Sequence, residues 1–117
     1  MVRSMQCGNL LAAVPEPLHQ EQVDVLVRSG AVRVERILSR GQVSEGWYDQ
    51  EQEEWVALLS GEARIAFEQG DELTLRPGDW VLIRAHQRHR VTYTSVEPPC
   101  VWVAMHFPGQ DGTTESR

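Results

Sequence analysis

Residues 41–61 read GQVSEGWYDQEQEEWVALLSG and carry the signals from which the fold of this chain is predicted. The stretch begins and ends with glycines, and an acidic run that includes Glu54 lies between them. The apolar run at residues 55–59 ends at Ser60 and Gly61, and residues 63–67 then largely alternate apolar with polar side chains. Glycine accepts the positive φ of a tight turn, and a period of two is typical of strands. The sequence therefore predicts a β-hairpin here.

Short strands separated by turn residues are expected on both sides of this hairpin, which is the pattern of a sandwich or barrel. Turn residues such as Gly30, Gly70 and Gly78 punctuate the chain at regular intervals. The predicted strands are residues 23–27, 32–37, 55–59, 63–67, 73–75, 80–83, 91–94 and 100–107. Residues 17–28 also suit a helix, so the state of that segment stays open.

Length and composition are those of one ordinary globular domain. The chain has 117 residues, of which 41% are hydrophobic and 24% charged, enough for one core and too few for two. We expect an N-terminal arm at residues 1–17, a single barrel domain at 18–107 and a flexible C-terminal tail at 108–117. Prolines at the end of the first segment and the Gly- and Thr-rich composition of the last support these boundaries.

The charge pattern excludes some classes of partner. The net charge is −6, and all eleven basic residues are arginines. Clustered positive charge is what phosphate backbones require, so no nucleic-acid partner is expected. No apolar run is long enough to span a membrane, and residues 1–10 lack a signal-peptide pattern. Cys7 and Cys100 are expected to be reduced thiols, and the protein is expected to be cytoplasmic.

Five residues that are typical of turns or of polar sites occur at a recognisable spacing: Gly41, Glu54, Gly61, Gly78 after a proline, and His89. This set, over residues 33–107, resembles the two short motifs of the cupin superfamily. The first motif runs glycine, five residues, His-x-His, three or four residues, glutamate, six residues and glycine. The second ends in a histidine. The resemblance implies an all-β fold, the cupin-type double-stranded β-helix or jelly-roll barrel.

The resemblance also implies a set of metal ligands, with one departure. In metal-binding cupins the two histidines, the glutamate and the later histidine are the usual ligands. Here Glu54 and His89 match, but Trp47 and Asp49 stand in place of the two histidines of the first motif. Asp49 is a chemically competent substitute, whereas a tryptophan cannot bind a metal. The ion would be Fe, Mn, Ni or Zn, and a site with no metal is an equal alternative.

Strand alternation extends the candidate site, because every second residue of a strand faces the same side. His106 shares a face with Trp102 on the last predicted strand, so it is a candidate second imidazole. His89 shares a face with Tyr93, and His86 precedes it in the connecting loop. The expected ligand-pocket residues are Trp47, His86, Tyr93 and Trp102.

Each candidate has an alternative interpretation. Glu54 and His89 can form a hydrogen-bonded buried pair with no ion. Asp49 can lie in a solvated loop, and His106 can be a core histidine bonded to a backbone carbonyl.

Three functions remain open at this stage. One is a metal-binding cupin that acts on a small molecule, with the metal as a Lewis acid. The second is a metal-free barrel that binds a small-molecule ligand without catalysis. The third is an interaction module, and a homodimer is expected in which the N-terminal strand is available for pairing. Whether the protein is an enzyme stays open, since a fold of this diversity does not specify chemistry.

Overall fold

The computed structural model describes residues 5–109 and shows an all-β molecule, with no helix in that part of the chain. Turn residues interrupt every apolar run before it is long enough for a helix. Because apolar and polar residues alternate, a strand buries the apolar side chains on one face. The eight strands are β1 (Gln22–Ser29), β2 (Val32–Ser39), β3 (Glu53–Ser60), β4 (Ala63–Phe67), β5 (Glu72–Leu75), β6 (Trp80–Ile83), β7 (His89–Thr94) and β8 (Cys100–Phe107).

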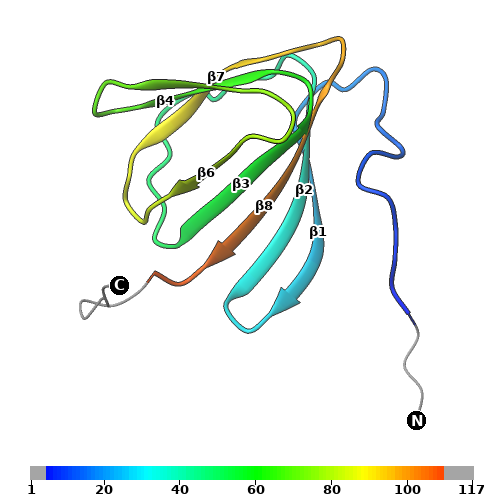
Figure 1. The fold of residues 1–117 in the computed structure, drawn as a ribbon, viewed down its shortest axis with the longest axis horizontal. Coiled ribbons are helices and arrows are strands. Elements are labelled where there is room, and N and C mark those ends of the chain that lie inside the picture. Colours follow the sequence, from blue (N-terminus) through cyan, green and yellow to red (C-terminus); the bar gives the residue numbers. More distant parts are fainter. Residues whose placement is uncertain (1–4, 110–117) are drawn as a thin grey trace.

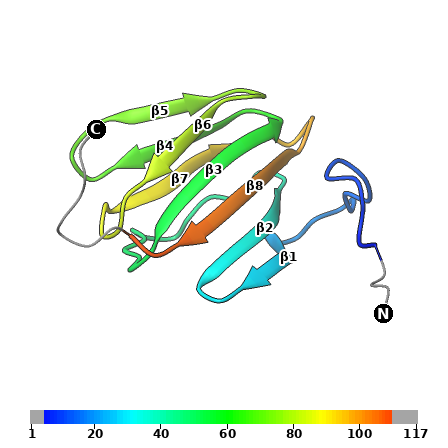
Figure 2. The ribbon, with the colours of Figure 1, turned by 60° about the horizontal axis from the view of Figure 1, so that its bottom comes forward.

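The strands form two antiparallel sheets that face each other (Figures 1 and 2). The larger sheet has the order β1-β2-β8-β3-β6, and the smaller has the order β5-β4-β7. Pairing between strands far apart in sequence, such as β2 with β8, is characteristic of a jelly roll. The predicted jelly-roll fold is therefore confirmed. Residues 17–28, for which the sequence allowed either a helix or a strand, form a strand from Gln22 onward.

The predicted hairpin around Gly61 is wrong, although both of its strands exist. β3 pairs with β6 and β8, whereas β4 pairs with β5 and β7, so Gly61 lies where the chain crosses from one sheet to the other. Its φ is +88°, and Ser95, Pro99 and Cys100 pack closely around it. A tight turn signal looks the same in both situations. Which strand the chain meets after the turn is decided by tertiary packing.

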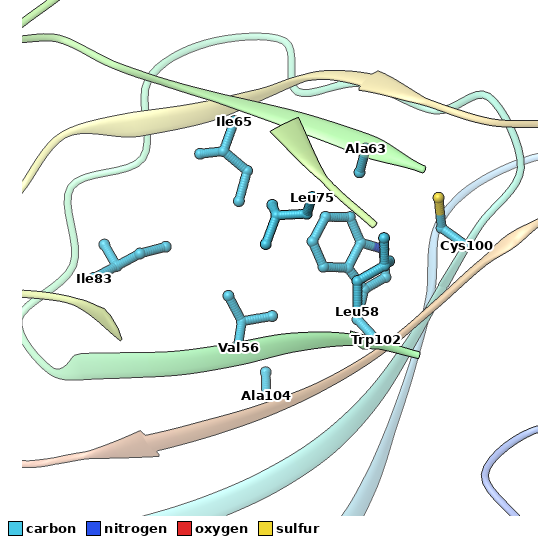
Figure 3. Close-up of a cluster of buried hydrophobic side chains, with 9 residues drawn as sticks. All are labelled: Val56, Leu58, Ala63, Ile65, Leu75, Ile83, Cys100, Trp102 and Ala104. Atoms are coloured by element: carbon cyan, nitrogen blue, oxygen red, sulfur yellow. The ribbon is translucent and has the colours of Figure 1, made fainter. Parts of the chain in front are cut away.

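The hydrophobic core lies between the two sheets, where side chains from both converge (Figure 3). Leu58 from the larger sheet and Leu75 from the smaller are almost completely buried, and Trp102 lies among them. Burying a side chain such as leucine stabilises a fold by about 1.5–3 kcal/mol. The remaining members of the cluster are Val56, Ala63, Ile65, Ile83, Cys100 and Ala104.

The described part of the N-terminal arm lies on the β1 side of the larger sheet (Figure 1). Arg36 of β2 donates hydrogen bonds from Nη1 to the carbonyl oxygens of Leu10 and Ala12, at 3.1 and 2.6 Å. Its Nη2 also pairs with Asp24 at 3.1 Å. The arm is thus held by backbone acceptors rather than by a strand of its own. Most of the predicted C-terminal tail, residues 110–117, lies outside the described residues.

Residues 5–109 contain no helix that is long and apolar enough to cross a membrane.

Candidate functional site

A cavity of about 260 Å³ lies between the sheets and is bounded by residues from both. We call it the Glu54 cavity. Its apolar wall continues the hydrophobic core, and Val56, Ile65, Ile83 and Trp102 belong to both (Figure 3). Its polar wall is formed by Glu21, Arg33, Glu35, Tyr48, Gln50, Glu54, His89 and His106. A concave, largely apolar space with a few converging polar groups is the usual form of a small-molecule site.

Glu54 occupies the centre of the polar wall because its strand, β3, lies beside β8 in the larger sheet. Cross-strand pairing places Glu54 directly opposite His106. Oε2 of Glu54 is 4.0 Å from Nε2 of His106, and Oε1 is 3.9 Å from Nε2 of His89. His89 reaches this point from β7 of the smaller sheet. The carboxyl group therefore lies between two imidazoles supplied by opposite sheets.

Burial controls the charge of this group. The pKa of Glu54 is raised from 4.5 to about 7, mainly by burial and further by the neighbouring carboxylates of Glu35 and Glu21, against a smaller opposing effect of Arg33. Charged carboxylates lose hydration in an apolar environment, so the neutral form is favoured. Burial also lowers the pKa of His89 and of His106, because it penalises the charged imidazolium.

Arg33 and Glu35 form an ion pair on β2 beside His106. Nε of Arg33 lies 2.6 Å from Oε2 of Glu35, and the other carboxylate oxygen lies 3.2 Å from Nε2 of His106. The register of β2 and β8 explains why this ion pair lies beside His106, since Arg33 is directly opposite His106. The single arginine in the cavity wall therefore has its charge offset by an adjacent carboxylate.

Tyr48 and Gln50 enter the site from the segment that precedes β3. Tyr48 forms an isolated bridge with His89, with a 2.7 Å bond from the Tyr48 amide to the His89 carbonyl. Two residues later, the Gln50 side-chain amide donates a 3.1 Å hydrogen bond to Oε1 of Glu54. The buried Oε1 of Gln50 has no hydrogen-bond partner among the described residues. Alternation within this extended segment places both residues at the cavity.

The same alternation turns Trp47 and Asp49 away, and neither lines the Glu54 cavity. Asp49 instead accepts a 2.7 Å hydrogen bond from Nδ1 of His86, and both side chains are more than half exposed. Arg90 lies over the ring of Trp47, 4.8 Å from its centroid. The expectation that Trp47 and His86 line the pocket and that Asp49 is a ligand within it is therefore corrected, since the half-exposed Tyr48 and the partly buried Gln50 line the cavity from this segment.

Tyr93 also lies outside the cavity, contrary to expectation, because a bulge interrupts its strand. The register of β4 and β7 shifts between Arg64 and Ile65, so that Arg64 pairs with Tyr93 and Ile65 with Val91. One extra residue reverses the alternation that follows it. Tyr93 is consequently exposed, and the guanidinium of Arg64 lies over its ring, 5.4 Å from the centroid.

The structure brings Glu54, His89, His106 and Trp102 together, as the strand alternation suggested. Sequence reasoning missed Arg33 and Glu35. Both share one face of β2, but polar residues on a strand resemble a solvent-facing set until the partner strand is known. It also missed Glu21, which precedes β1 and has a pKa raised by burial and by Glu35.

The residues present do not fit a preformed metal centre. Two neighbouring ligands that bind one ion at about 2.1 Å each lie roughly 3.0–3.4 Å apart. Here the imidazoles of His89 and His106 lie 3.9 and 4.0 Å from different oxygens of Glu54. Across residues 5–109, no group of three or more His, Cys, Asp or Glu side chains is arranged to hold a metal ion. Asp49, the proposed substitute ligand, lies outside.

Comparison with protein families gives the same fold assignment. The family model described as a cupin domain matches residues 34–106. This chain belongs to the cupin domain family. That match begins within β2 and ends at His106 in β8, so the core of the jelly roll and most of the cavity wall lie inside it. Among curated protein sequences, none matches the chain at a significant level.

Solved structures resemble the cupin chain over most of its length. A putative mannose-6-phosphate isomerase from Ralstonia eutropha JMP134 is 41% identical, with a TM-score of 0.87 over 90% of this chain and 100% of that one. A cupin superfamily protein from Desulfitobacterium hafniense DCB-2 is 18% identical, with a TM-score of 0.74 over 91% and 94% of the two chains. An RmlC-like cupin from Desulfovibrio desulfuricans is 19% identical, with a TM-score of 0.70 over 91% and 100%. The last two show the fold alone.

Proposed function

We propose that this cupin binds a small organic molecule in the Glu54 cavity, and that binding does not depend on a metal ion. The observation that carries the proposal is the position of the Glu54 carboxyl group between His89 and His106 above an apolar wall. A buried polar cluster of this kind is costly to maintain. A ligand that hydrogen-bonds to it while filling the apolar space offsets part of that cost.

The size of the cavity indicates how much of a ligand it can enclose. An engineered cavity of about 150 Å³ in another protein holds benzene, which has six non-hydrogen atoms. By proportion, about 260 Å³ accommodates a molecule of roughly ten. Trp102 and Val91 would pack against its apolar part. The name of the Ralstonia relative suggests a sugar phosphate, so mannose 6-phosphate belongs in any panel of test compounds.

A fragment screen observed by NMR tests the proposal. Trp102 lines the cavity, and its indole N–H donates to Ser39 at 3.3 Å, so its resonance reports on occupancy. We expect some compounds of up to about ten non-hydrogen atoms to shift this resonance in metal-free protein. Replacing Val91 with phenylalanine, which adds volume to the cavity wall, should abolish the shift. The control Val96→Phe changes an exposed valine and should leave it intact.

Two results would contradict this function. One is a panel, including mannose 6-phosphate, that leaves the Trp102 resonance unchanged. The other is stoichiometric transition metal in protein purified without an affinity tag, if Glu54→Ala or His89→Ala removes the metal while the fold is retained. The second result would restore the metal-binding alternative.

Edge strand β1 favours a second function, self-association with another copy of this chain. β1 ends the larger sheet, so one side of its backbone has no partner strand in the described structure. Val23, Val25, Leu26 and Val27 expose between 44% and 52% of their surface. Edges of this kind pair readily with another strand, and two-fold pairing is the commonest closed form.

Size-exclusion chromatography with light scattering should give a dimer, and Val25→Lys should give a monomer. A wild-type monomer at high concentration would contradict it.

A further inference from the structure

The lining of the Glu54 cavity has more carboxyl groups than arginine side chains, which affects the charge of the ligand that it can bind. Three of the side chains that line it carry carboxyl groups: Glu21, Glu35 and Glu54. Arg33 is the one arginine of the lining, and its Nε is already paired with Glu35 at 2.6 Å. An anionic ligand would meet more carboxyl groups than free positive charge. For a cationic ligand, the same carboxyl groups would be attractive.

The Gln50–Glu54 pair shows the same preference. Oε1 of Gln50 is a buried acceptor with no partner, and the nitrogen of the same amide already donates to Glu54. An unsatisfied buried acceptor costs free energy, which a donor on the ligand would recover. Gln50 and Glu54 both line the cavity, so the Gln50 amide would lie beside an N–H-bearing group bound at Glu54. Neither acceptor offers anything to a phosphate or carboxylate oxygen.

We propose that the ligand of the Glu54 cavity is a small organic cation, in which a protonated amine faces Glu54, Glu35 and Gln50 and an apolar body packs against Trp102. The proposal rests on the proposed function, since it names the ligand class of the same cavity. It departs from the sugar phosphate that the name of the Ralstonia relative suggests.

Three compounds of nearly equal shape separate the ligand classes. 2-Phenylethylamine carries a positive charge at neutral pH, 2-phenylethanol is neutral and phenylacetate is negative, while all three share one apolar body. Binding is measured by calorimetry, and the site is located by the Trp102 indole resonance. We expect the amine to bind at least tenfold more tightly than the alcohol, and the acid to bind more weakly than the alcohol. Raising the salt concentration should weaken the amine only modestly, because buried charges are screened less than exposed ones.

Charge-matched variants show whether the carboxyl groups are responsible. Glu35→Gln and Glu54→Gln each replace a carboxyl group of the cavity with an amide that cannot ionise, with little change in shape. Each should weaken the amine at least tenfold and change the alcohol less than threefold. Glu51→Gln removes the same charge from an exposed position outside the cavity, so it should change neither affinity by more than twofold. If one cavity variant fails to fold, the other and the wild-type compound series still decide the question.

The outcomes distinguish the two proposals. If the alcohol, phenylacetate or mannose 6-phosphate shifts the Trp102 resonance and binds as tightly as the amine, the cationic class is wrong and cavity binding stands. If Glu51→Gln weakens the amine as much as Glu54→Gln does, the attraction is a general effect of net charge, and the assignment to this site is wrong. If no compound perturbs Trp102, both proposals fail.

Discussion

The amide of Gln50 donates a 3.1 Å hydrogen bond to Oε1 of Glu54, while its own oxygen is buried without a partner. The two residues are four apart in sequence, but they do not share a helix. Gln50 lies in the extended segment before β3, and Glu54 lies within β3. This contact links the segment that carries the altered cupin motif to the centre of the cavity, and it has measurable consequences.

Removing both partners should reveal a coupling between Gln50 and Glu54. In a double-mutant cycle of Gln50→Ala and Glu54→Ala, we expect a coupling free energy of about 1 kcal/mol at pH 6, where Glu54 is mostly neutral. Above pH 8 the acceptor is charged, and the coupling should rise to about 2 kcal/mol. Urea denaturation of the four proteins at both pH values measures it. A coupling near zero at both values would show that the contact contributes nothing.

The pKa of Glu54 predicts how stability changes with pH. Burial, with a smaller contribution from neighbouring carboxylates, raises it from 4.5 to about 7, so between these values the folded protein retains a proton that the unfolded chain releases. The free energy of unfolding should therefore fall as the pH rises through this window, by up to about 3 kcal/mol. Glu54→Gln cannot ionise and should lack this loss, so above pH 7 it should be more stable relative to wild type than at pH 4.5.

The difference between wild type and Glu54→Gln isolates this effect from the two histidines. His89 and His106 have pKa values lowered by burial, so they reduce stability as the pH falls below 6.5 in both proteins. Their contributions largely cancel in the difference. Urea denaturation at half-unit steps from pH 4.5 to 8 gives the curve. A difference that does not vary with pH would mean that Glu54 is an ordinary carboxylate.

Gly61 should not tolerate a side chain. Its φ is +88°, and a Cβ would lie 2.8 Å from the Pro99 carbonyl oxygen and from side-chain atoms of Ser95 and Cys100. The unfavourable φ and the overlap together should cost about 3 kcal/mol in Gly61→Ala. Gly30→Ala is the matched control, because its φ is also positive and nothing lies within 4 Å. It should cost about 1 kcal/mol. Equal losses in urea denaturation would contradict the close packing at Gly61.

The Asp49–His86 pair should behave as a surface contact. Both side chains are more than half exposed, so His86→Ala and Asp49→Asn should each change the free energy of unfolding by less than about 0.5 kcal/mol. Neither should change the affinity of a ligand that shifts the Trp102 resonance. His106→Ala should reduce that affinity, because His106 lines the cavity. A large loss of affinity in Asp49→Asn would contradict this prediction and would show that Asp49 belongs to the ligand site.

Much of the fold was predictable because strands and turns are specified locally. Alternating apolar residues and the glycines between them predicted the strands, and the motif spacing predicted the family. The same alternation placed Glu54 and His106 on inward faces, where the structure has them. It failed at Tyr93, because a bulge in β7 changes the alternation and a bulge leaves no local signal in this sequence.

The sequence by itself determined that the chain is an all-β cupin with a glutamate and a histidine at motif positions, because turn chemistry and strand periodicity act over a few residues. Only the tertiary structure decided that Gly61 joins two sheets, that Tyr48 and Gln50 face the cavity in place of Trp47 and Asp49, and that Glu35 offsets the charge of Arg33. Each depends on which strands become neighbours. That choice is made by burial and register between distant segments.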